Sequence, residues 1–118
     1  MRDRRVEPRM LCADLVTVEW HESSRRKRSC TGNLEDISGA GACVQVDRAV
    51  PMGTPIRIAH AKYECEGVVK YCVFHETGFF LGVEFEPGMG WSKQKFCPQH
   101  LLDPRQIRIQ PGKRTRSA

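Results

Sequence analysis

The chain has 118 residues, of which 40% are hydrophobic and 28% are charged, a composition typical of one soluble globular domain. No apolar run approaches the roughly 20 residues that a membrane-spanning helix needs. The charged N-terminus is not followed by the apolar stretch of a secretory signal. These features predict a cytoplasmic protein that does not insert into a membrane, with its six cysteines in the reduced form.

Strand signals recur along the chain at short intervals. Alternation of apolar and polar residues predicts strands at 10–20, 29–38, 41–47, 55–61, 63–76 and 78–86. In 10–20 the apolar residues change face, from Leu11 and Leu15 to Val16 and the residues after it, which indicates a bulge or a strong bend. Polar residues at 21–28 are expected to link the first two strands. This spacing predicts an all-β fold, a small six-stranded antiparallel barrel.

The C-terminal part carries the one helix candidate, at 91–102. Ser92 can cap this helix, whereas Pro98 must interrupt it. After Ile109 the chain loses its apolar content, so residues 103–118 are expected to form a basic, disordered tail. The predicted barrel domain with its helix therefore covers 11–102.

The formal net charge of +5 is concentrated in a few short segments. Residues 103–118 contain five basic residues and one acidic residue, a net charge of +4, which leaves +1 for the rest of the chain. A domain that binds nucleic acid normally spreads basic charge over one face. Nucleic acid is therefore a disfavoured partner. The remaining basic clusters, at the N-terminus and in RRKR at 25–28, suit a small anionic ligand better.

Two short motifs stand out, RVEPR at 5–9 and DISGAG at 36–41. Taken alone, the first is typical of a solvated terminus and the second of a turn. Together they supply the groups that a guanine nucleotide needs. Arginine offers paired donors to phosphate oxygens and to the O6/N7 edge of guanine. A carboxylate accepts from guanine N1–H and N2–H, a hydroxyl bonds a neighbouring polar group, and glycine lets the backbone approach closely.

With these motifs the chain resembles the PilZ domains, which bind the bacterial messenger cyclic di-GMP. The resemblance extends over about residues 2–102, because GTPIRI (53–58), EGVVKYCV (66–73) and GFFLGVEF (78–85) are similar to the later strands of that family. It implies a six-stranded antiparallel barrel with a C-terminal helix. It also implies a receptor without catalytic activity or cofactor, which passes the signal to a downstream protein partner.

The resemblance assigns a role to individual residues. Arg5 and Arg9 would contact the phosphates and guanine faces, from a flexible arm at 1–10 that folds over the ligand. Asp36 and Ser38 would contact guanine, and Gly41 would allow close approach. As residues two apart on a strand, Asp36 and Ser38 are expected to point the same way, with Ile37 in the core.

Arg4 has two interpretations, a solvated neighbour of nearby acids or a contact to a second ligand molecule. Four other functions compete with this one. A zinc site from the C-x-x-H pairs Cys72/His75 and Cys97/His100 is disfavoured, because residues i and i+3 of a strand point to opposite faces. An enzyme is disfavoured because no G-x-S-x-G or H-E-x-x-H motif is present. A PilZ-like interaction module without ligand and a small nucleic-acid-binding barrel remain as alternatives, and the oligomeric state is open.

Overall fold

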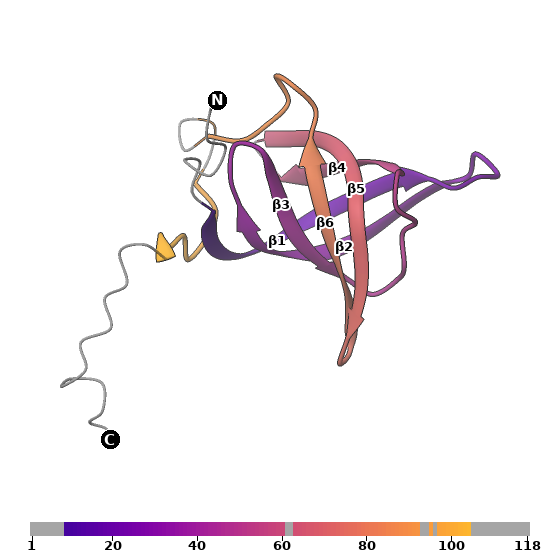
Figure 1. The fold of residues 1–118 in the computed structure, drawn as a ribbon, viewed down its shortest axis with the longest axis horizontal. Coiled ribbons are helices and arrows are strands. Elements are labelled where there is room, and N and C mark those ends of the chain that lie inside the picture. Colours follow the sequence, from indigo (N-terminus) through magenta and orange to yellow (C-terminus); the bar gives the residue numbers. More distant parts are fainter. Residues whose placement is uncertain (1–8, 61–62, 93–94, 96, 105–118) are drawn as a thin grey trace, which may run out of the picture.

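The computed structural model describes residues 9–60, 63–92, 95 and 97–104 (Figure 1). In this part of the chain six strands form, which are β1 (Met10–His21), β2 (Lys27–Ile37), β3 (Gly41–Val46), β4 (Pro55–His60), β5 (Tyr63–His75) and β6 (Gly78–Phe85). They close into an antiparallel barrel in the order β1-β2-β3-β6-β5-β4. The predicted all-β class and the six-stranded barrel are confirmed. Most of the expected arm at 1–10 and of the tail at 103–118 lies outside the described residues.

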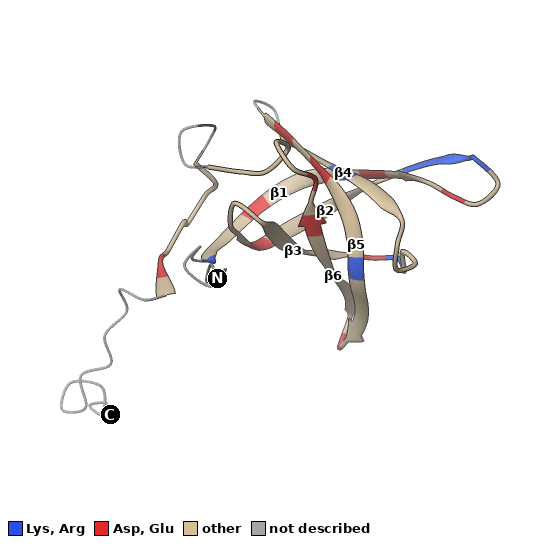
Figure 2. Ribbon diagram, turned by 45° about the horizontal axis from the view of Figure 1, so that its top comes forward, with Lys and Arg blue, Asp and Glu red and all other residues tan. Residues whose placement is uncertain are grey.

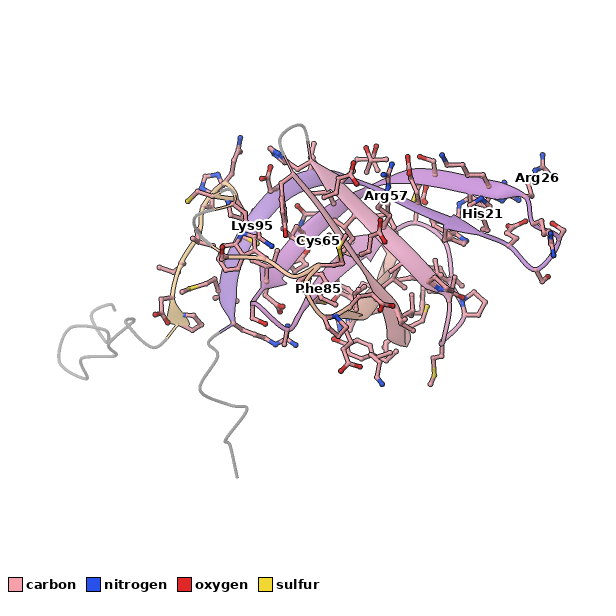
Figure 3. All side chains as sticks on the ribbon, turned by 90° about the horizontal axis from the view of Figure 1, so that it is seen from above. His21, Arg26, Arg57, Cys65, Phe85 and Lys95 are labelled. Atoms are coloured by element: carbon pink, nitrogen blue, oxygen red, sulfur yellow. The ribbon has the colours of Figure 1, made fainter. Side chains whose placement is uncertain are left out.

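The barrel interior is filled by one apolar cluster. Val18, Val44 and Leu81 have no exposed surface, and Cys65 and Phe85 lie inside the barrel as well (Figure 3). These side chains come from strands β1, β3, β5 and β6, so the core depends on closure of the sheet rather than on any single hairpin. Closure therefore fixes which face of each strand is buried.

The first strand differs from its prediction. Alternate residues from Met10 to Trp20 are buried without interruption, whereas Leu11 and Leu15 are exposed. The predicted change of face is therefore wrong, although the register of β1 against β2 does shift between Leu11 and Asp14, as a bulge requires. Asp14, a charged residue, occupies one of the inward positions and is buried.

A second register shift lies in β2, between Leu34 and Asp36, where the strand pairs with β3. Leu34 and Ile37 are three residues apart, and a regular strand would point them to opposite faces. The bulge lets both enter the core, where each is 1% exposed. It also turns Asp36 to the outer surface of the barrel.

Two hairpins extend beyond the closed part of the barrel, formed by β1 with β2 and by β5 with β6 (Figure 1). The first hairpin turns at 22–26, where Arg25 adopts a φ of 69°. Figure 2 shows lysine and arginine residues gathered near the end of this hairpin, away from the barrel body. The RRKR cluster is thus held at a distance from the two motifs.

The helix expected over 91–102 is not formed by the residues of that range that the structure describes, which are 91–92, 95 and 97–102. Residues 97–102 instead run along β1. The amides and carbonyls of Leu11 and Leu102 bond each other at 2.7 Å, and the Ala13 amide donates to the Gln99 carbonyl at 3.0 Å. Pro98 has no amide hydrogen to donate in a helix. β4 pairs only with Thr17–Trp20 of β1, so the edge of β1 before Thr17 is open and the C-terminal segment pairs with it. The described residues include no helix that is long and apolar enough to cross a lipid bilayer.

Candidate functional site

The DISGAG segment forms the turn between β2 and β3, and Ser38 closes it. The Ser38 amide donates to the Gly41 carbonyl at 2.8 Å, and its hydroxyl accepts from the amides of Ala40 at 3.2 Å and Gly41 at 3.3 Å. Ser38 is only 4% exposed. It therefore does not share the outward direction of Asp36 as expected, because the chain has already left the strand at this position. The prediction that Ile37 points into the core is confirmed.

Gly41 is required by packing inside the barrel. A Cβ atom at this position would overlap the backbone carbonyl of Val83 on β6. The turn is covered from the other side by the segment after β6, where a Cβ at Gly90 would overlap the carbonyl of Gly39. The Phe85 amide also donates to the Ala40 carbonyl, at 2.8 Å. The glycines of the motif thus bring three segments of backbone into close contact.

Asp36 and Arg9 join the two sequence motifs. Arg9 Nη1 lies 2.5 Å from Asp36 Oδ1, and the two side chains are 54% and 22% exposed. This contact follows from the strand register, since Leu11 pairs with Asp36 and Arg9 lies two residues before Leu11. Arg4 and Arg5 lie outside the described residues. Of the six residues in the expected ligand site, the structure therefore places four at one end of the barrel.

The outer surface beside this ion pair carries an aromatic ring. Strand pairing aligns a row of residues across the barrel wall, from Leu11 and Asp36 through Cys43 and Gly82 to Tyr71. The Tyr71 ring covers Gly82, where a Cβ would collide with it. The Tyr71 hydroxyl and the Cys43 thiol influence each other's pKa, and 45% of Tyr71 is exposed. The row presents an aromatic ring next to a charged pair.

Burial keeps the thiol and the phenol of this row protonated. The pKa of Cys43 is raised mainly by burial, with the hydrogen bond from Tyr71 opposing the rise and the charge of Asp36 adding to it. The pKa of Tyr71 is also raised, first by burial and then by Cys43 and Asp36, while Arg9 lowers it. Neither group is charged at neutral pH. The charges in this row therefore come from Arg9 and Asp36.

Sequence reasoning missed Tyr71, Cys43 and Gly82 as members of the site. Nothing in their local pattern marks them, because they meet Asp36 only through the pairing of β2 with β3, β3 with β6 and β6 with β5. The buried carboxylate of Asp14 was missed for a similar reason. Its Oδ2 atom lies 3.4 Å from His60 Nε2 and accepts from the Gln99 amide at 3.3 Å.

The main hollows among the described residues are not lined by Arg9, Asp36 or Tyr71. A hollow of about 440 Å³ lies elsewhere, between the β1–β2 hairpin and strands β4 and β5, where His21 and Arg57 border it (Figure 3). None of the described motif residues lines this hollow. Its charged groups include Arg57 and Glu19, which already bond each other at 2.9 Å. We therefore assign no ligand to the hollow.

The C-x-x-H pairs do not converge on a metal position. Cys72 packs against the core, whereas the His75 ring lies edge-on to Phe80, with 6.1 Å between the ring centroids. Within the described ranges no group of three or more His, Cys, Asp or Glu side chains could hold a metal ion. The six cysteines are free thiols.

No protein-family model matches this chain, and no curated protein matches it either. The motifs and the geometry of the barrel surface are therefore what points to a function.

Proposed function

We propose that this protein is a bacterial, cytoplasmic cyclic di-GMP receptor of the PilZ type, without catalytic activity. The observation that carries the proposal is the contact between Arg9 and Asp36, which unites residues of two motifs that are 27 positions apart in sequence. Both motifs are intact in the chain, and both match the resemblance on which the expectation was based.

The ion pair has the chemistry of an occupied guanine position. A guanidinium group and the N1–H/N2–H edge of guanine both present parallel N–H donors to a carboxylate. In the free protein Arg9 satisfies Asp36. When guanine takes its place on the carboxylate, the guanidinium becomes available to a phosphate of the same ligand. Arg9 thus exchanges one anionic partner for another, and the Asp36 carboxylate keeps hydrogen-bond donors, now from guanine.

Tyr71 supports the same proposal, because its exposed ring offers a stacking surface for a base. Arg5, and Arg4 if a second ligand molecule binds, would add contacts from the N-terminal arm. Folding of this arm over the ligand is the proposed signal to a protein partner. The ligand can shift that equilibrium only by the difference between its affinities for the two forms.

The decisive experiment is a calorimetric titration of the full chain with cyclic di-GMP, beside GTP and cyclic GMP. We expect saturable binding of cyclic di-GMP alone. Tyr71→Ala should weaken it by about 1–3 kcal/mol, the range measured for loss of one base-stacking partner. Phe74→Ala is the matched control, because Phe74 is 61% exposed on the opposite face of the same hairpin. Absence of heat with cyclic di-GMP, or equal affinity for GTP, would reject the proposal.

One observation favours a second candidate, an interaction module that binds no nucleotide. The Ser38 hydroxyl is engaged by its own turn, and Gly41 is required by packing against β6. These two motif residues therefore have a role in the fold that needs no ligand. A protein that is silent in the titration but stable and folded would support this candidate.

A further inference from the structure

The barrel strands are not paired along their whole length. β4 pairs with β5 only from Tyr63 to Val68, and the backbone of Val69 bonds to the loop at 53–54. In the part of the chain that the structure describes, no strand pairs with Lys70–His75 on that side. An open edge presents backbone donors and acceptors to which another strand can bond.

A second open edge exists on β2, at Lys27–Gly32, since β3 pairs with β2 only from Asn33 onward. The two edges differ in character. The edge of β2 begins with Lys27 and Arg28 and continues with polar side chains, a composition that discourages pairing between molecules. The edge of β5 has one lysine at its start, Lys70, and then carries exposed aromatic and apolar side chains.

The exposed side chains of β5 form an apolar patch with β6. Tyr71 is 45% and Val73 51% exposed, and both lie on the outer face of the hairpin. Phe80 pairs with Val73, and the His75 ring contacts Phe80. We call these four residues the hairpin patch. A contiguous apolar surface beside an unpaired strand edge marks a site of protein association.

We propose that the hairpin patch and the edge at Lys70–His75 form the interface of a symmetric dimer, in which the edges of two copies pair antiparallel. An antiparallel strand pair has a twofold axis, so one edge serves both copies and the assembly closes. A register centred on Val73 places Lys70 opposite Glu76 of the partner subunit, the turn residue that directly follows β5. It also places Tyr71 opposite His75 of the partner subunit. The charges at the two ends of the pairing are therefore complementary.

Lys70 is available for this contact. Its Nζ atom lies 3.2 Å from Glu84 Oε1, but both side chains are more than half exposed. An ammonium group has three donors, so it can contact a second carboxylate without leaving the first. Pairing of the β5 edge with the β2 edge of another copy would join two different surfaces. Such a contact would not close, and would build open chains.

Sedimentation equilibrium of the full chain over a range of concentrations tests the interface. We expect a monomer–dimer equilibrium for the wild type. Val73→Lys should raise the dissociation constant at least about tenfold, because like charges would face each other at the twofold axis. Leu15→Lys is the matched control, since Leu15 is 68% exposed on β1, separated from Val73 by the paired residues Asn33, Gln45 and Phe80. It should leave the constant unchanged.

A charge exchange tests the register. Lys70→Glu and Glu76→Lys should each weaken the dimer, and the double variant should restore it, with thermal unfolding confirming that every variant is folded. A wild type that is monomeric at every soluble concentration overturns the proposal. So does a dimer that Val73→Lys leaves intact, or a series of larger oligomers in place of a dimer. The proposal does not rest on nucleotide binding. Because Tyr71 belongs to both surfaces, calorimetry of Val73→Lys, which changes the dimer interface alone, tests the receptor function separately.

Discussion

The ion pair between Arg9 and Asp36 allows stability and ligand binding to be separated. Its two side chains are 54% and 22% exposed, so solvent screens their attraction, and Arg9→Ala should lower the free energy of unfolding by no more than about 1 kcal/mol. Loss of a charge-assisted hydrogen bond to bound ligand costs about 1.5–3 kcal/mol, which weakens cyclic di-GMP affinity roughly 10- to 150-fold. The effect on binding should therefore exceed the effect on stability.

Urea unfolding gives the first quantity and calorimetric titration the second. The exchange Arg9→Asp with Asp36→Arg restores an ion pair of opposite polarity, so stability should recover. Binding should stay weak, because guanine N1–H and N2–H then face a donor instead of an acceptor. Arg48→Ala serves as control, since Arg48 and Asp47 form a longer exposed pair of 3.9 Å elsewhere. Unchanged affinity in Arg9→Ala, or recovery of affinity in the exchange, would refute this reasoning.

Three further predictions concern the barrel itself. Gly41→Ala should destabilise the fold by about 1–3 kcal/mol in urea unfolding, because the new methyl group forces the β6 backbone at Val83 away. An unchanged urea midpoint would show that β3 and β6 can move apart at this position without cost. Ser38→Ala should cost about 1–3 kcal/mol, because it leaves turn amides without their acceptor; Ser38→Thr keeps that acceptor and should cost less. Burial raises the pKa of Cys12 to about 12 and that of Cys65 to about 11, from 9.0. The folded state therefore keeps protons that the unfolded chain releases, so stability should be complete below about pH 9 and fall as pH rises above it. A flat profile of unfolding free energy between neutral and alkaline pH would contradict the burial of these thiols.

The sequence by itself determined the strands and the two motifs. Alternation with period two is a local property, so the pattern at 41–47, 55–61 and 78–86 located β3, β4 and β6 to within one residue at each end. The chemistry of Arg9 and Asp36 is equally local, because it belongs to the side chains themselves. The expected hairpin between the first two strands was enough to predict that these residues come close.

Tertiary structure decided which face of each strand is buried. Leu11 and Leu15 are more apolar than Cys12 and Asp14, so the local pattern assigned the wrong face to the start of β1. The bulge and the closure of the barrel set the actual face, and His60 and the Gln99 amide provide Asp14 with partners that no neighbour in sequence supplies. The C-terminal segment likewise pairs with the part of the β1 edge that β4 leaves open.

Tertiary structure also decided the composition of the site. Tyr71 reaches the neighbourhood of Asp36 through three successive strand pairings, and its ring requires a glycine at position 82. The open edge at Lys70–His75 has the same origin, because it depends on where β4 stops pairing with β5. Side-chain chemistry and strand period are encoded locally, whereas register and closure depend on residues far apart in the chain. This difference is why the sequence alone predicted the strands and motifs, while the surface around them required the folded barrel.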